Sequence, residues 1–181
     1  MRLRLTVLAL TLLLPSFCVN ALAQKGLGIG SFQSFKGVGL SFETLSPSGR
    51  EFNTFTLYAD LAGMYLGYNE APGVKFNYSH NIRIAQFSPQ TLDDLSFIAG
   101  SGFSTGWVKD SGRDNYWVSA ALSGTFGARA VFPCRVCFIL GITLETGLLL
   151  YDNGGHATTT LYRDGIYHII LPHLTISYQF K

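Results

Sequence analysis

Charge is scarce in this sequence. Of the 181 residues only 13% are Asp, Glu, Lys or Arg, whereas a soluble domain is usually about one quarter charged. The 13 basic and 11 acidic side chains form no basic patch, which argues against nucleic acid as a partner. After residue 23 the chain also lacks the roughly 18 uninterrupted apolar residues of a membrane helix. It therefore fits neither an ordinary soluble domain nor a helical membrane protein.

The one long apolar run lies at the start of the chain and is typical of an export signal. Arg2 and Arg4 form a basic start, Leu5–Leu14 is the apolar stretch, and Ala21–Ala23 is a small-residue cleavage site. A proline and polar residues interrupt the run too early for a membrane anchor. A lipid anchor at Cys18 is the weaker alternative. The sequence predicts a cleaved signal peptide over residues 1–23 and one domain over residues 24–181.

Cysteine is also rare, with three residues in the chain. Cys134 and Cys137 stand in a predicted turn between two strands. Zinc would require two more ligands at similar spacing and a redox CxxC would require a helix start, and the sequence offers neither. Two alternatives remain for this pair: a structural disulfide, which an oxidising periplasm allows, or two inert thiols. We expect no metal and no cofactor.

What the sequence does contain is alternation with a period of two residues, clearest from Val74 to Gln86. One face of this run is apolar apart from a histidine, and the other is polar. The first face carries Val74, Phe76, Tyr78, His80, Ile82 and Ile84, and the second carries Lys75, Asn77, Ser79, Asn81 and Arg83. A tilted membrane strand needs about 9 to 11 residues, so this run is long enough to cross a bilayer.

Similar segments recur along the chain and predict eight strands without any helical period. They are Gly26–Phe32, Gly37–Thr44, Phe52–Tyr65, Val74–Gln86, Ser96–Val108, Tyr116–Val131, Phe138–Leu150 and a last strand from about Tyr167 to Phe180. Turns at 46–49, 88–94 and 132–136 alternate with longer links at 66–73, 109–115 and 152–165. The predicted class is all-β, an eight-stranded antiparallel up-and-down transmembrane β-barrel with both termini in the periplasm.

In such a barrel the polar faces line the lumen. The predicted polar lumen network consists of Glu43, Asp60, Lys75, Arg83, Arg129, Glu145 and His173. Eight strands leave an interior just wide enough for side chains to fill. Because an unpaired buried charge is costly, these side chains are expected to pair across the lumen and plug it. The alternative is a narrow gated pore or a proton-linked path.

The last strand contains the segment from Leu174 to Phe180, LTISYQF. Together with the export signal and the strand meander, it resembles the small bacterial outer-membrane β-barrel proteins. The resemblance implies a Gram-negative outer membrane with its lipids and lipopolysaccharide as surroundings. It also implies that Tyr178 and Phe180 signal to the barrel insertion machinery. Lys181 departs from the terminal aromatic that is usual in these proteins.

Two enzymes with similar barrels, a lipid A deacylase and a lipid A palmitoyltransferase, led us to look for catalytic residues. His80 lies on an apolar face, and the turn at 88–94 brings it near Ser101 of the next strand, so these two are the weak catalytic candidates. No acid lies near them on that face, and the His-x-Ser pattern of the deacylase is absent. His156 and His168 are more simply solvated loop residues than metal ligands.

The leading hypothesis is thus a non-enzymatic outer-membrane protein with a structural, adhesion or surface-interaction role, whose outer loops contact an unknown partner. One alternative is a membrane-embedded enzyme acting on lipid A or phospholipid acyl chains, and another is a narrow, porin-like pore. A third is a soluble lipocalin-like barrel with its faces reversed. That barrel would need a charged outer surface, yet the polar faces consist mostly of Gly, Ser and Thr.

Overall fold

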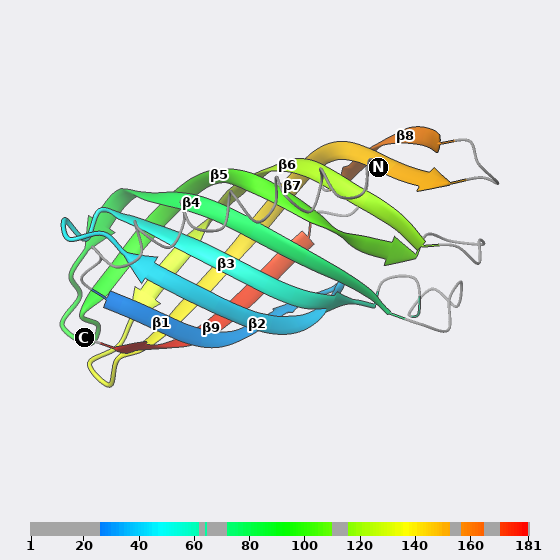
Figure 1. Ribbon diagram of the computed structural model, residues 1–181. Coiled ribbons are helices and arrows are strands. Elements are labelled where there is room, and N and C mark those ends of the chain that lie inside the picture. Colours follow the sequence, from blue (N-terminus) through cyan, green and yellow to red (C-terminus); the bar gives the residue numbers. More distant parts are fainter. Residues whose placement is uncertain are drawn as a thin grey trace.

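A computed structural model describes residues 26–61, 64, 72–109, 116–152, 157–164 and 171–180, and it shows a tilted barrel of strands (Figure 1). The predicted signal peptide over residues 1–23, the terminal Lys181 and the loop histidines His156 and His168 lie outside the described residues. Among the described residues, no helix is long and apolar enough to cross a membrane.

Within the described residues, nine strands form the wall. They are β1 (Gly26–Ser34), β2 (Gly37–Leu45), β3 (Glu51–Asp60), β4 (Gly73–Phe87), β5 (Asp94–Lys109), β6 (Tyr116–Val131), β7 (Val136–Asp152), β8 (Ala157–Asp164) and β9 (Leu171–Phe180). Neighbours along the chain pair antiparallel from β1 to β8. The wall closes because β9 pairs with β1 on one side and with β7 on the other.

The closed wall has eight strand positions, because β8 and β9 share one. Both run antiparallel to β7: Glu145 pairs with Asp164, and Thr143 pairs with Leu171. Between these two pairs the position on β7 changes by two residues, whereas the position on its partner changes by seven, from Asp164 to Leu171. The eighth strand position is therefore interrupted between β8 and β9. The predicted class, an all-β antiparallel eight-stranded barrel, is confirmed.

Two boundaries were predicted wrongly. The strand predicted over Phe52–Tyr65 is β3 and ends at Asp60. The sequence suggested a loop over residues 152–165, whereas Ala157–Asp164 is strand β8. Three consecutive threonines at 158–160 favour an extended backbone, because β-branched residues pack well on a pleated surface. The stretch was missed because its polar and apolar residues do not alternate.

The polar face of β4 points into the barrel and its apolar face points outward, as the alternation predicts. Lys75, Ser79 and Asn81 are buried inside, whereas Val74 and Ile82 are exposed outside. The strand also carries a bulge between Arg83 and Ala85, where its register against β5 shifts by one residue. A bulge changes the direction in which the following side chains point. The alternation of inward and outward residues therefore does not continue to the end of β4.

Glycines on the inner wall make room for large side chains. A Cβ added to Gly141 would lie 2.8 Å from the His173 ring and 3.1 Å from the Phe126 carbonyl oxygen. By contrast, a Cβ added to Gly124, on the outer face of the neighbouring strand, would meet no heavy atom within 4 Å. Gly141 is therefore required by packing and Gly124 is not.

We expect Gly141→Ala to lower the free energy of unfolding by about 1–3 kcal/mol, because it overpacks the lumen against His173. Urea unfolding in phospholipid vesicles, followed by tryptophan fluorescence, measures the change. The matched control, Gly124→Ala, should be neutral or slightly stabilising. Equal destabilisation by both substitutions would contradict this packing.

Candidate functional site

The inner end of the lumen, toward the turns at 46–50 and 132–135, is closed by four charged side chains from four strands. Arg129 of β6 reaches across to Glu43 of β2, with Nη2 3.4 Å from Oε2. Its Nη1 lies 3.4 Å from Asp94 Oδ2, and Arg83 Nη1 lies 3.0 Å from the same oxygen. Two cations and two anions thus form a neutral chain, which we call the inner network.

Neutral donors and an aromatic ring complete the inner network. The Ser177 hydroxyl donates to Glu43 Oε1 at 2.6 Å, and the Gln179 amide donates to Oε2 at 3.4 Å. The guanidinium of Arg129 lies 5.1 Å from the centre of the Phe52 ring, which adds a cation–π contact. The side chains of both Arg129 and Glu43 are 0% exposed. The charges at this level are therefore balanced, while Arg129 Nε, Arg83 Nε and Asp94 Oδ1 are buried without a hydrogen-bond partner among the described residues.

An apolar cluster fills the space around the inner network. Its members come from four strands and share burial inside the wall: Phe52, Ile98, Val131, Cys137 and Ile139. Sequence reasoning missed this cluster, since Ile98 and Ile139 stand on faces dominated by glycine and polar residues. Their inward position could have been found by continuing the period of Ser96 and Gly100 through residue 98.

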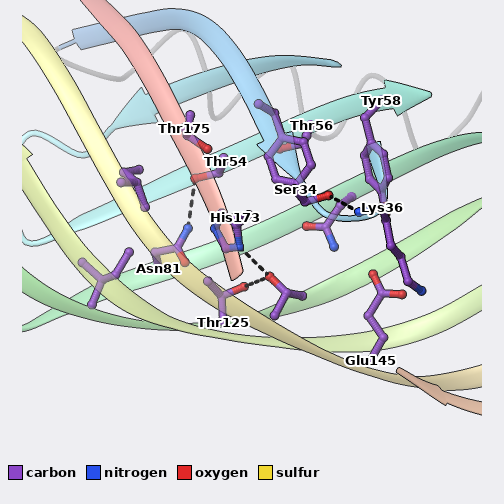
Figure 2. A pocket seen from close by; sticks show the side chains of 15 residues that line it. Ser34, Lys36, Thr54, Thr56, Tyr58, Asn81, Thr125, Glu145, His173 and Thr175 are labelled. Atoms are coloured by element: carbon purple, nitrogen blue, oxygen red, sulfur yellow. Dashed lines mark hydrogen bonds between the residues drawn. The ribbon is translucent and has the colours of Figure 1, made fainter. Parts of the chain in front are cut away.

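The outer half of the lumen holds a small polar cavity of about 50 Å³. Figure 2 shows Glu145 and His173 on its wall, reaching it from β7 and β9. Lys75 Nζ lies 2.6 Å from Glu145 Oε2, and this buried pair crosses the lumen between β4 and β7. A volume of this size holds a few water molecules, each needing about 10–15 Å³, and no larger solute.

His173 is held in this cavity by two contacts. Its Nδ1 lies 3.3 Å from the Thr143 hydroxyl, and its ring stacks on Phe32 at a centroid distance of 5.5 Å. Phe32 in turn packs on Tyr58, 5.1 Å away. Aromatic rings therefore narrow the lumen between the cavity and the wall of β1 and β3.

The structure brings most of the predicted lumen residues into these two clusters. Glu43, Lys75, Arg129, Glu145 and His173 are buried, and Arg83 and Asp60 are partly buried. Asp60 stands at the end of β3, away from the inner network. Asp94 is the network member that the sequence did not single out, because it was assigned to a turn. It begins β5, and its alternation with buried Ser96 was the available signal.

On the outer face, polar residues form a row across four neighbouring strands. Thr44 pairs with Asn53, Asn53 with His80, and His80 with Ser101. We call these four residues the outer polar row. Asn53 Oδ1 lies 2.9 Å from His80 Nδ1 and accepts the Tyr78 hydroxyl at 3.0 Å, while its amide donates to Thr44 at 3.3 Å. The two weak catalytic candidates are therefore cross-strand neighbours, with an asparagine orienting the histidine.

On β4 and β5 the outer polar row crosses the middle of the apolar band, whereas Thr44, which is buried, and Asn53 lie near the ends of β2 and β3. His80 is the central residue of β4, with exposed Val74 on one side and exposed Ile82 and Ile84 on the other. Ser101 is flanked in the same way by Phe97 and by Trp107. Hydrogen-bonding groups are therefore placed where the surface is otherwise apolar.

The two cysteines are free and occupy different surroundings. Cys137 is buried within the apolar cluster, and Cys134 is exposed on the turn between β6 and β7. The structure thus does not form the candidate disulfide, and it places one thiol inside the barrel and the other outside.

Aromatic pairs surround the inner rim of the barrel. Tyr178 and Phe180 contact each other edge to face at 5.1 Å, and Phe87 with Phe97 and Phe132 with Phe138 form similar pairs. Tyr178, Phe180 and Phe87 are exposed on the outer face. Such girdles flank the apolar band of membrane barrels. The predicted role of Tyr178 and Phe180 in insertion stays a prediction.

We expect Arg129→Met to lower the free energy of unfolding by about 3 kcal/mol, because it leaves Glu43 buried without its cation. The double variant Glu43→Gln with Arg129→Met should recover most of this loss. Urea unfolding in phospholipid vesicles provides the measurement. Arg50→Met, on an exposed turn, is the control and should change stability by less than about 0.5 kcal/mol. If Arg129→Met lowered the free energy of unfolding as little as the control does, the result would contradict the inner network.

Neither a protein-family model nor a curated protein sequence matches this chain. Two solved structures are similar to it in shape. The N-terminal β-barrel domain of Pseudomonas aeruginosa OprF has a TM-score of 0.53 at 11% identity, covering 87% of this chain and 98% of that one. Ail, the attachment invasion locus protein of Yersinia pestis, has a TM-score of 0.41 at 12% identity, covering 86% and 97%. The likeness to the OprF domain shows that the fold is that of an eight-stranded outer-membrane β-barrel.

Proposed function

We propose that this chain is an integral outer-membrane protein with a plugged lumen and a non-enzymatic role in contacts at the cell surface. The outer face supports membrane insertion. Its exposed side chains include Leu40, Leu57, Phe97, Leu122 and Leu140, each more than half exposed. A soluble monomer rarely exposes apolar patches of more than a few hundred Å², whereas an apolar band of about 25 Å is the normal outer surface of a membrane barrel.

One observation carries the non-conducting role: the ion pair of Arg129 and Glu43 spans the lumen while both side chains are completely buried. An ion path would have to break this pair, displace Phe52 and pass the apolar cluster. The buried charges balance inside the inner network, so no net charge remains to select a permeating ion. The lumen therefore acts as a rigid filling that holds the wall in place.

The outer end of the barrel supports a role in surface contacts. Strands β5, β6 and β7 are 16 to 17 residues long, whereas β1 and β2 are 9 residues each. As Figure 1 shows, the β7–β8 hairpin extends well past the short β1–β2 hairpin. A strand of 9–11 residues is enough to cross a bilayer, so the longer strands have length left over to project from it.

We expect the purified full chain to give no conductance steps in planar bilayers. Replacing both Arg129 and Phe52 by alanine should produce steps, because it removes the ion pair and the ring beneath it. Arg50→Ala, on an exposed turn, is the control and should be silent. Regular open steps from the unmodified chain would contradict the plugged lumen, and release from cell membranes by salt washing alone would contradict integral insertion.

Lipid acyl chemistry is the second candidate function, and one observation favours it. The hydrogen bond that His80 donates to Asn53, opposite Ser101, resembles a nucleophile–base–orienter arrangement. The position of these residues opposes it, because the ester bonds of lipids lie at the membrane surface, about 12–15 Å from the middle of a 25–30 Å core. The site is in the middle of the apolar band instead.

We therefore expect the acyl composition of lipid A and phospholipids to be the same in cells with and without the chain. Mass spectrometry of extracted lipids measures it, and His80→Ala should leave the profile unchanged as well. Loss or gain of an acyl chain that depends on His80 would establish the enzyme and contradict the non-enzymatic role.

A further inference from the structure

The outer polar row leaves two hydrogen-bonding groups without partners. Because Asn53 Oδ1 can only accept, His80 Nδ1 carries the proton of that bond, and the neutral ring then presents Nε2 as an acceptor. Within the described part of the chain, neither His80 Nε2 nor the Ser101 hydroxyl makes a hydrogen bond, although the two residues are directly opposed. Ser101 is exposed. An acceptor and a donor therefore stand side by side on the same face.

The histidine is held in this position by its neighbours. Asn53 uses both ends of its amide, since the oxygen is shared by His80 and Tyr78 and the nitrogen donates to Thr44. The Tyr78 ring packs between Phe55 and Phe103, with centroid distances of 5.2 and 5.5 Å. The orientation of His80 is thus set by the structure of the monomer, and no ordering of this ring is needed on association.

The residues that follow His80 along the row toward β6 have small side chains, so the outer surface is recessed there. The row continues from Ser101 to Gly124 on β6, and space is open above Gly124. One residue row away, Phe55, Tyr78 and Phe103 form an aromatic ridge. A ridge beside the small residues Ser101 and Gly124 gives complementary relief on a single face. Small residues let membrane-embedded backbones approach closely, and polar side chains then hydrogen-bond across the contact.

We propose that this face is a docking surface for a second copy of the chain, with a twofold axis along the barrel and between β4 and β5. His80 Nε2 accepts a hydrogen bond from Ser101 of the partner subunit, and the reciprocal bond forms across the axis. A twofold contact requires one patch that complements itself, which an acceptor and a donor at the same level of adjacent strands provide. Acyl chains offer neither hydrogen-bond partner, so lipid is the poorer occupant.

The test measures self-association of the full chain in phosphatidylcholine vesicles. Cys134 is exposed and Cys137 is buried, so in a Cys18→Ser background a maleimide dye reports on Cys134 alone. Energy transfer between donor-labelled and acceptor-labelled copies then reports the dimer. Diluting the protein in lipid yields the dissociation constant. His80→Ala and Ser101→Ala should each raise that constant at least tenfold, and the double variant should be no weaker than either single one, because both remove the same pair.

The matched control is Ser31→Ala. Ser31 is likewise exposed on the outer face, but it stands on β1, on the opposite wall from β5. It should change the dissociation constant less than twofold. Energy transfer no greater than that of randomly mixed monomers at every protein density would overturn the proposal, and so would equal weakening by the control.

Covalent capture provides a second readout that does not depend on affinity. In a background of Cys18→Ser and Cys134→Ser, an oxidant is added to intact membranes that hold both His80→Cys and Ser101→Cys copies. The two should link into a species of twice the mass, because the twofold contact places these positions opposite each other. Membranes that hold His80→Cys and Ser31→Cys copies should show no such species. Linking by both or by neither overturns the proposal. Heat-dependent gel migration of each variant shows that its barrel is closed before it is scored.

Discussion

Closure of the wall between β1 and β9 is the constraint on which the remaining structure depends. Eight cross-strand pairs, from Leu27 with Phe180 to Ser34 with His173, join the two ends of the meander. In hydrocarbon an open sheet edge would expose backbone groups that nothing can satisfy, so a membrane wall of strands has to close on itself. Closure at eight positions also fixes the width of the interior, which is then narrow enough to be filled by side chains.

The side chains that fill the lumen are determined by the width of the barrel interior. Polar residues face inward on alternate positions of strands such as β4 and β6, and the few charges among them meet partners from the opposite side, as Arg129 does with Glu43 and Lys75 with Glu145. A buried pair of this kind adds little stability compared with an apolar filling, yet breaking it is expensive. The inner network thus keeps the side chains of the lumen in one arrangement. Gly141 leaves the space that the His173 ring occupies.

The parts of this structure that period-two alternation describes were predictable from the sequence. The faces of β4, the inward positions of Lys75 and Arg129, and the opposition of His80 and Ser101 all follow from counting residues. Three features break that rule. Asp94 follows a turn, Ile98 and Ile139 place apolar groups on an inner face, and β8 has no alternation because its threonines and neighbours are of similar polarity. Partner choice inside the lumen also lay beyond the sequence, since it depends on strand stagger around the barrel.

The ladder between β1 and β9 has a further consequence for how the chain reaches its folded state. Its residues are among the most distant in the sequence, so the first strand has to wait for the last before it gains its second neighbour. Contacts between such remote segments slow folding, because the loop entropy is lost before the contact forms. Until that moment the growing sheet carries two bare edges, one at β1 and one at its newest strand. Assembly would then be limited by how well those edges are shielded from other chains.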